Sequence, residues 1–355
     1  MTILLSVDAM GGDHGVTTTI PACIRILNEH PDVNLLLVGD QDIITTQLKK
    51  NKFTSFGDRI EIIHTTQVVG MDEPPQSAMR AKKDSSMRVA INLVKQGKAN
   101  ATISSGNTGA LMAIARYVLG TMDGIDRPAI AKILPTIKDD VCVLDLGANI
   151  ECSAAHLLQF GIMGTQLMKG PSGKDAPSVG ILNIGSEDIK GHDVLKQAAV
   201  LFKESSLNFY GNVEGNDINK GIVDVVVCDG FTGNVALKTL EGTAKMISNF
   251  LKEEFNRSIT SKLIGLIALS ILKRVKSRLD PRKYNGAVLL GLNGLVIKSH
   301  GGADELAFYY ALKQAYDEVN SGFIPLLKEY LTKYKQEITA EDPSKLPEFD
   351  YLSML

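Results

Sequence analysis

Five short turns of the sequence combine glycines with polar side chains, and each turn follows a run of apolar residues. They lie at residues 8–14, 105–109, 145–149, 228–234 and 299–302. Glycines let backbone N–H groups approach an anion, and a helix that begins at such a turn adds partial positive charge. These turns therefore predict a site that holds a phosphate-like group.

The turn at 105–109 offers the densest set of hydrogen-bond donors. Ser105, Gly106, Asn107, Thr108 and Gly109 bring hydroxyls, an amide and free N–H groups to an expected helix start. We expect Asn107 to stabilise an oxyanion during catalysis and the other four residues to bind substrate. The alternative is that Ser105 or Thr108 only caps the helix.

Two histidines, His14 and His300, lie in the first and the last turn. An imidazole titrates near neutral pH, so either one can act as a general acid or contact phosphate. We expect both to be catalytic. A structural or exposed side chain is the alternative for each.

The remaining candidates come from the same turns and their surroundings. A carboxylate repels phosphate, so Asp229 would orient a cationic or backbone donor, with helix capping as the alternative. For the candidate lysines, a solvated surface position is the alternative. Asn234 joins Asp229 as a catalytic candidate, and the further substrate contacts that we expect are Gly11, Gly12, Asn149, Lys190 and Lys238.

The elements that must position these turns alternate between strand-like and helix-like patterns. Ile60–His64 is a short strand candidate, whereas residues 85–96 repeat apolar side chains at close to 3.6-residue spacing and stop at Gly97. This alternation predicts an α/β fold with a mostly parallel Rossmann-like sheet and helices on both of its faces. Ligands bind such sheets beyond the carboxyl ends of the strands. For residues 74–83, which begin with two prolines, we expect a loop.

The composition is that of a globular protein. The 355 residues are 44% apolar and 22% charged with a net charge of −2, so the chain can bury a full core and lacks an overall nucleic-acid signature. The first residues lack a signal-peptide pattern, and no apolar run reaches the ~18 residues of a transmembrane helix. We expect a cytoplasmic protein with one catalytic domain at 1–335, either a single unit or two lobes around a cleft, and a tail at 336–355.

Residues 257–280 depart from this pattern. Leu263–Leu272 are nearly all apolar, and cations flank them on both sides. Ten helical residues span about 15 Å, half of a hydrocarbon core, so the segment predicts a helical insertion that lies on a membrane surface. A buried helix, a dimer interface and a contact for an acidic carrier protein are the alternatives. The contact residues that we expect are Lys262, Leu266, Ile267, Lys273, Arg274, Lys276 and Arg278.

Seven strings of the sequence resemble, in order, the motifs of bacterial phosphate acyltransferases of the PlsX type. The resemblance covers about residues 1 to 330, and seven ordered strings are far more specific than one glycine-rich turn. They are 7–14 (VDAMGGDH), 82–87 (KKDSSM), 105–112 (SGNTGALM), 144–149 (LDLGAN), 211–215 (GNVEG), 228–238 (CDGFTGNVALK) and 298–301 (KSHG).

The resemblance implies an enzyme that transfers an acyl chain from acyl carrier protein to inorganic phosphate. The acyl phosphate would supply a membrane-bound glycerol-phosphate acyltransferase in phospholipid biosynthesis. The implied fold is a three-layer α/β/α sandwich, similar to phosphotransacetylases and to isocitrate and isopropylmalate dehydrogenases, in a homodimer. No metal or nicotinamide cofactor is expected, and no nucleic-acid partner.

Three other functions compete with this hypothesis. A short-chain phosphotransacetylase would use acyl-CoA, and a nicotinamide-dependent dehydrogenase would need a GxGxxG string after the first strand, which residues 11–15 do not provide. A non-enzymatic membrane scaffold would leave the five turns without a purpose.

A different mechanism for acyl transfer would form an acyl-enzyme on Cys228. That cysteine lacks a neighbouring histidine in the sequence to serve as base.

Overall fold

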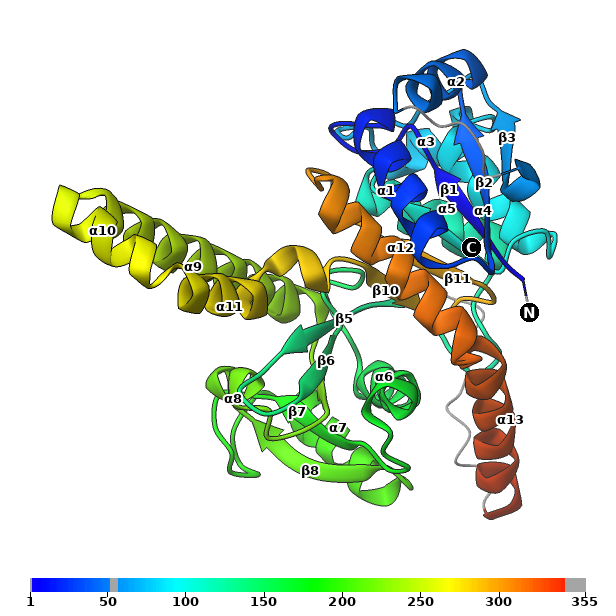
Figure 1. Ribbon diagram of the computed structural model, residues 1–355. Coiled ribbons are helices and arrows are strands. Elements are labelled where there is room, and N and C mark those ends of the chain that lie inside the picture. The colour runs from blue at the N-terminus through cyan, green and yellow to red at the C-terminus, as the bar shows by residue number, and fades with distance from the viewer. Residues whose placement is uncertain (1, 52–56, 342–355) are drawn as a thin grey trace.

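The computed structural model describes residues 2–51 and 57–341, and within them the chain folds around one eleven-stranded sheet (Figure 1). The strand order is β3-β2-β1-β4-β11-β10-β5-β6-β9-β7-β8. The strands are β1 (Ile3–Asp8), β2 (Val33–Gly39), β3 (Ile60–His64), β4 (Ala101–Ser104), β5 (Ala129–Pro135), β6 (Asp140–Leu144), β7 (Ser178–Leu182), β8 (Asn208–Val213), β9 (Val225–Val227), β10 (Ala287–Leu290) and β11 (Leu295–Lys298).

The sheet is parallel at both ends and antiparallel in its middle. The pairings among β3, β2, β1, β4 and β11 are parallel, as are those among β6, β9, β7 and β8. Only β10 and β5 introduce antiparallel pairs, with β11, with each other and with β6. The predicted mostly parallel sheet is confirmed, and its antiparallel centre was not foreseen.

Helices cover both faces of the sheet. They are α1 (Val16–Glu29), α2 (Gln41–Lys50), α3 (Pro75–Ala81), α4 (Ser86–Lys95), α5 (Thr108–Leu119), α6 (Ala154–Ser172), α7 (Asp193–Glu204), α8 (Gly215–Lys220), α9 (Gly230–Asn256), α10 (Ile259–Ile267), α11 (Leu269–Leu279), α12 (Glu305–Asn320) and α13 (Phe323–Glu341). The expected helix at 85–96 is α4, which is capped by Ser85 and followed by Gly97 at φ 69°.

Side-chain alternation along β1 shows how the layers form. Leu5 and Val7 are buried in the core that contains Ile20 of α1, whereas the hydroxyl of Ser6 between them donates to the carbonyl of Ala90 in α4. Successive residues of a strand point to opposite faces, so α1 and α12 lie on one side of β1 and α4 on the other. This arrangement is the three-layer sandwich that the family resemblance implied.

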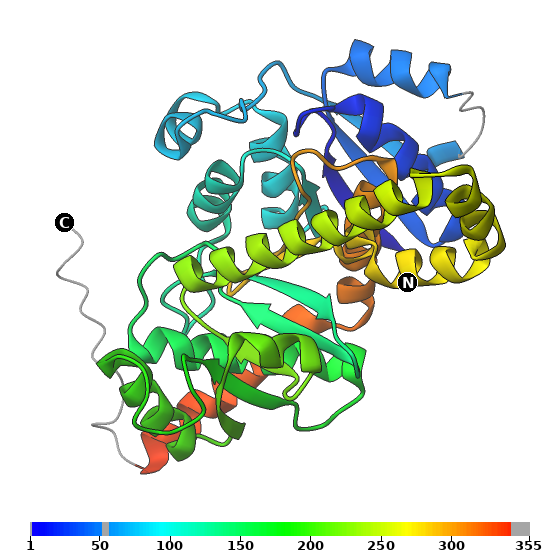
Figure 2. The same ribbon diagram turned by 90° about the vertical axis from the view of Figure 1, so that its left-hand side faces the viewer.

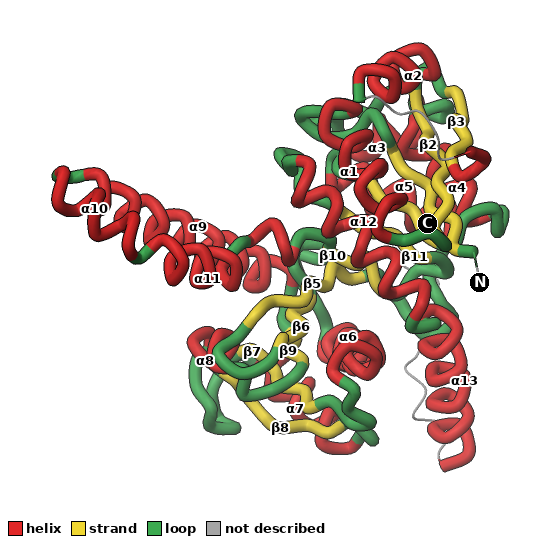
Figure 3. Tube along the Cα trace, in the orientation of Figure 1, coloured by secondary structure: helices red, strands yellow, loops and turns green. Residues whose placement is uncertain are grey.

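The molecule has two lobes and a long helical arm. One lobe contains β1–β4 with α1–α5, the other contains β6–β9 with α6–α8, and β5 and β10 run between them (Figures 1 and 3). The far part of α9 with α10 and α11 projects from the body, as the view turned by 90° also shows (Figure 2). We call residues 243–279 the arm.

Two stretches differ from their expected structure. Residues 75–81 form helix α3, not a loop, because Pro75 occupies the first helical turn, where a missing N–H costs nothing. Arg80 therefore lies on a helix and Lys82 at its end. Residues 336–341 of the expected tail continue helix α13, and residues 342–355 lie outside the described part.

No helix in the described part of the chain is long and apolar enough to cross a bilayer. The insertion expected at 257–280 forms the helix pair α10 and α11, and α10 buries none of its side chains within this chain. The alternative of a helix buried in the chain's own core is therefore wrong. The side chain of Lys276 in α11 lies outside the described part.

Candidate active site

The turns that follow β1, β4 and β11 pack against one another. The N–H of Asp13 donates to the carbonyl of Gly301 over 2.9 Å, and the hydroxyl of Ser105 donates to the carbonyl of Gly11 over 2.9 Å. The three strands are neighbours in the sheet, so the carboxyl ends of β1, β4 and β11 bring these turns together as the sequence predicted.

The buried carboxylate of Asp8 links the residues around this first cluster of turns by hydrogen bonds. It accepts the hydroxyls of Ser86 and Ser104, each over 2.6 Å, and burial raises its pKa. Gly12 has a φ of 83°, and a Cβ there would lie 2.6 Å from the Ser105 hydroxyl oxygen. Asp8 and Gly12 therefore have clear structural roles in this turn packing.

The turns that follow β6 and β9 form a second cluster, centred on Asp145. Its carboxylate accepts the backbone N–H of Asn149 from its own turn and that of Ile130 from strand β5. The N–H of Gly230 donates to the carbonyl of Asn149 over 2.7 Å. Burial raises the pKa of Asp145.

A cavity of about 360 Å³ lies between the two clusters. Both lobes line it, together with β5, β10 and the first turns of α9. We call it the cleft. Its polar lining comprises Asp13, Thr108, Lys132, Asn234, Lys238, Glu241, Asn285, Lys298, Ser299 and His300, and its apolar lining comprises Met71, Ile130, Leu146, Leu237 and Ala287.

Three lysines make the cleft cationic. Glu241 bridges two of them, with 3.4 Å to Lys132 and 2.9 Å to Lys238. Burial alone would raise the pKa of Glu241, but the hydrogen bond from Lys238 and the charge of Lys132 hold it below its usual range. Burial lowers the pKa of Lys132.

Lys298, the third lysine, is buried at the end of β11. Its Nζ donates to the carbonyls of Ser105 and Ser299 and forms no ion pair with any carboxylate of the described residues. Burial lowers its pKa to about 8, against the pull of the Asp8 and Asp13 charges. A buried cation that lacks a bound counter-charge is a strong candidate for an anion contact.

His300 is fixed beside this lysine by its own backbone. The backbone N–H of His300 donates to Oδ1 of Asn285 over 3.0 Å. The ring Nδ1 of His300 accepts the backbone N–H of Gly302 over 3.1 Å. Burial and the charge of Lys238 lower its pKa. The imidazole is therefore neutral at pH 7 with its proton on Nε2, which makes it a hydrogen-bond donor more than a general acid.

Four of the sequence-predicted site residues line the cleft. They are Thr108, Asn234, Lys238 and His300. Ser105, Gly106, Gly11 and Gly12 lie directly behind it in the first cluster, where Gly106 donates its N–H to Ser104. His14 is exposed, Lys190 lies in the turn after β7, and Gly109 packs on Pro75 of α3; none of these three lines the cleft.

Three predicted site residues use their polar atoms within the fold instead. Asn107, not Ser105 or Thr108, caps α5 through Oδ1, and its amide donates to the carbonyls of Met71 and Glu73. Asn149 donates its amide to Pro128 and Asp145. Asp229 caps α9 by accepting from Thr232. These contacts argue against an oxyanion or substrate contact by the side chains of Asn107 and Asn149.

Sequence reasoning missed Lys298 and Lys132. Each is a lone cation within an apolar strand, in LVIK and AIAKILP respectively. Lysine is almost never buried without a reason, so a cation at such a strand position is a usable signal. Cys228 is buried and its pKa is raised well above the usual range, which argues further against an acyl-enzyme.

Comparison with known proteins identifies the family. Residues 3–326 match the family model described as "Fatty acid synthesis protein". The chain belongs to this family. A relative from Chromobacterium violaceum named "Phosphate acyltransferase" is 60% identical over 333 residues, which are 94% of this chain and 96% of the relative. A relative of the same name from Paraburkholderia phytofirmans is 55% identical over 92% of this chain and 89% of its own length. The resemblance seen in the seven strings is confirmed.

Solved structures confirm the fold. A phosphotransacetylase from Streptococcus pyogenes has a TM-score of 0.60 at 15% identity and covers 90% of this chain and 94% of its own. A branched-chain phosphotransacylase from Enterococcus faecalis has a TM-score of 0.55 at 11% identity and covers 90% of this chain and 99% of its own. The chain thus shares its overall fold with these two proteins.

Proposed function

We propose that this chain is a phosphate acyltransferase that moves an acyl group from acyl carrier protein to inorganic phosphate in the cleft. The observation that carries the proposal is Lys298, a buried cation at the carboxyl end of β11 that lacks an ion-pair partner among the described residues and lines a small cavity together with Lys238 and His300. Family membership and the names of the relatives support the same reaction.

The reaction needs positioning and charge neutralisation more than a protein nucleophile. A phosphate oxygen forms a bond to the thioester carbonyl carbon, the carbon–sulfur bond breaks, and the proton of hydrogen phosphate ends on the thiol. In this proposal Lys298 and Lys238 hold the phosphate, which keeps the attacking oxygen near the carbonyl. Nε2–H of His300 donates to a phosphate oxygen or the developing oxyanion.

Glu241 and Asn285 position these groups. Glu241 holds Lys132 and Lys238 side by side through its carboxylate. Asn285 accepts the backbone N–H of His300, and its amide donates to the hydroxyl of Ser299 over 2.8 Å. The apolar lining residues of the cleft, among them Ile130 and Ala287, then suit the first carbons of an acyl chain.

An assay with purified protein tests the function. Long-chain acyl carrier protein thioester and phosphate should give acyl phosphate, trapped with hydroxylamine as the hydroxamate, with release of carrier thiol. Turnover of short acyl-CoA with no turnover of the carrier thioester would favour a short-chain phosphotransacetylase instead. Hydride transfer with a nicotinamide cofactor and no acyl phosphate would favour a dehydrogenase.

We further propose that the arm contacts membranes and that the protein acts at the cytoplasmic face. Exposed apolar side chains gather toward its tip, including Ile267 at 85% exposure, and cations such as Lys262 and Arg274 flank them. Such a surface suits the interface of anionic lipid. This location would deliver acyl phosphate to a membrane-bound glycerol-phosphate acyltransferase.

A homodimer is the second proposal for the arm. The outer part of α9 exposes Met246, Ile247, Phe250 and Leu251, which lie four residues apart in two rows on one helix face. A contiguous apolar face of this kind is typical of a protein–protein interface. The membrane contact and the dimer can coexist because the dimer face belongs to α9 and the membrane residues belong to α10 and α11.

A further inference from the structure

The segment between β3 and α3 contributes one side chain to the cleft. Met71, in the middle of this segment, lines the cleft and is 36% exposed. A Cβ added at Gly301 would lie 2.6 Å from the terminal methyl of Met71, so that methyl packs directly on the glycine next to His300. A side chain from the 68–73 segment thus lies against the turn that carries the candidate catalytic histidine.

One anchor ties this segment to the start of α5. The amide of Asn107 donates to the carbonyl of Met71 over 2.6 Å and to that of Glu73 over 3.1 Å. Oδ1 of Asn107 accepts the N–H of Ala110 over 3.0 Å. Asn107 therefore fixes the backbone of Met71 relative to the first cluster of turns.

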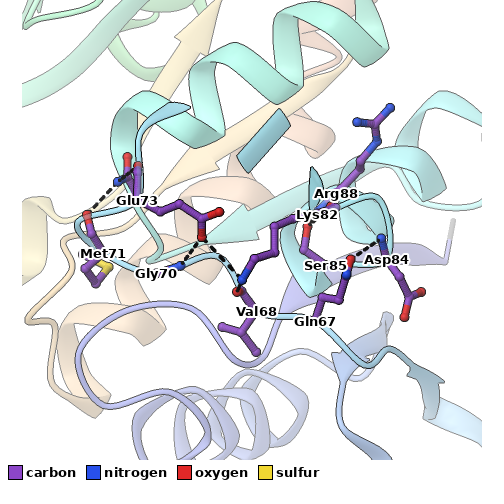
Figure 4. Close-up of polar contacts among 10 residues, drawn as sticks. Gln67, Val68, Gly70, Met71, Glu73, Lys82, Asp84, Ser85 and Arg88 are labelled. Atoms are coloured by element: carbon purple, nitrogen blue, oxygen red, sulfur yellow. Dashed lines mark hydrogen bonds and ion pairs between the residues drawn. The ribbon is translucent and has the colours of Figure 1, made fainter. Parts of the chain in front are cut away.

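A second anchor lies on the other side of the segment (Figure 4). Glu73 accepts the N–H of Gly70 over 3.1 Å and lies 3.5 Å from the ammonium group of Lys82. The same ammonium donates to the carbonyl of Val68 over 2.7 Å. These contacts close the turn that presents Met71, so its position is set by the fold.

An apolar side chain at this place has no use in holding phosphate. A thioether is only a weak acceptor and donates nothing, so Met71 adds no anion contact to the lysines and hydrogen-bond donors that line the same cleft. Its unbranched chain adapts to irregular surfaces and excludes water from them. The feature that needs such protection in acyl transfer is the reacting carbonyl.

We infer that Met71 shields the thioester carbonyl from water and so determines how much acyl group reaches phosphate. The inference rests on the proposed acyl transfer. When water replaces phosphate, its oxygen bonds to the carbonyl carbon, the carbon–sulfur bond breaks, and the products are a free carboxylic acid and the carrier thiol. Exclusion of water from a closed site is a general means of preventing this side reaction.

The product ratio of a Met71→Ser variant tests the inference. Radiolabelled acyl carrier protein and phosphate are incubated with enzyme, and free acid and acyl phosphate are measured against carrier thiol released. We expect the ratio of free acid to acyl phosphate to rise about tenfold in Met71→Ser. Glu73→Ala, which frees the turn but keeps the methionine, should raise the ratio in the same direction.

Two variants serve as controls. Met71→Leu keeps apolar bulk and should retain the wild-type ratio. Val68→Ser removes an exposed apolar side chain of the same segment that does not line the cleft, so it should also retain that ratio. If folded Met71→Ser gives the wild-type ratio of free acid to acyl phosphate, the inference is wrong but the proposed function still stands. If the wild-type protein itself forms no acyl phosphate, the proposed function fails and the inference fails with it.

Discussion

Lys298 is a residue whose burial costs free energy unless an anion binds beside it. The residue is 8% exposed, and its ammonium group donates hydrogen bonds to the carbonyl oxygens of Ser105 and Ser299. Taking a charge out of water is expensive, and proteins keep such charges where a ligand repays the cost. The neighbouring lysines differ because Glu241 already neutralises part of their charge.

Substituting Lys298 by methionine should separate binding from stability. We expect kcat/KM for phosphate to fall ~10²-fold or more, because a preorganised charge at the reacting anion is lost. The melting temperature should be retained, since an apolar side chain of similar length replaces a buried charge. Lys313→Met, on the surface of α12, is the matched control. Normal phosphate kinetics in Lys298→Met would remove this lysine from the site.

The low pKa of Lys298 predicts a pH dependence. With a pKa of about 8, the side chain is cationic below that pH and neutral above it. kcat/KM for phosphate should therefore fall as pH rises through about 8. An arginine remains charged throughout this range, so Lys298→Arg should lose this fall. An identical alkaline fall in both proteins would assign the titration to another group.

At the scale of elements, the turns depend on close backbone approach. The contact of Gly12 with Ser105 and Gly301 links the loops that follow three strands, and it is possible only without a side chain. Gly97, at the end of α4, has a similar φ of 69° but no atom within 4 Å of an added Cβ. A side chain at Gly97 would therefore meet only the strain of a positive φ, whereas one at Gly12 would meet that strain and a steric clash as well.

Alanine at these two positions should give different losses. Gly97→Ala should lower the free energy of unfolding by ~1 kcal/mol, from the left-handed backbone alone. Gly12→Ala should cost ~1–3 kcal/mol more because the turns must move apart, and activity should fall as well. Urea unfolding of both variants provides the measurement. Equal losses would mean that the first cluster tolerates a side chain at Gly12.

The arm exposes many apolar side chains to solvent among the residues that the structure describes. If it binds membranes, the protein should sediment with anionic vesicles and be released by salt, since each nearby cation contributes about 1 kcal/mol of screened attraction. Leu266→Glu with Ile267→Glu should abolish sedimentation and leave transfer from carrier protein intact. The control pair is Ile137→Glu with Val200→Glu, which changes exposed apolar residues of the body. Loss of sedimentation in the control pair would contradict the arm as the contact.

At the scale of the whole molecule, the two lobes share one sheet. The cleft forms where β5 and β10 change the strand direction, so each lobe contributes one cluster of turns. Residues of β10, β11 and α9 line the cleft together, although the arm intervenes between them in the sequence. The arm therefore leaves the body next to the cleft.

Light scattering tests the dimer at this scale. The wild-type protein should have twice the chain mass of 38.4 kDa. Phe250→Asp, in the apolar face of α9, should give the single-chain mass because a charge would enter the interface. Tyr117→Asp changes an exposed aromatic residue of the body and should leave the mass unchanged. A wild-type protein of single-chain mass would overturn the proposal.

The sequence by itself determined several of the strands, the turns that follow them and the family. Runs such as Ile3–Val7 and Ala101–Ser104 combine apolar side chains with small polar ones because both faces of a central strand are buried, and a glycine-rich polar turn follows each run. These features are local, so they can be read along the chain. His300, Asn234 and Thr108 were found in this way and do line the cleft.

Only the tertiary structure decided which polar atoms remain for substrate. Asn107 has the residue type of an oxyanion donor, but carbonyls of Met71 and Glu73, more than thirty positions earlier, take its amide hydrogens. Lys298 and Lys132 come from strands on either side of β10, and their use depends on burial that no local pattern reports. A hydrogen bond goes to whichever partner the fold brings near, and that partner is set by the pairing of distant strands.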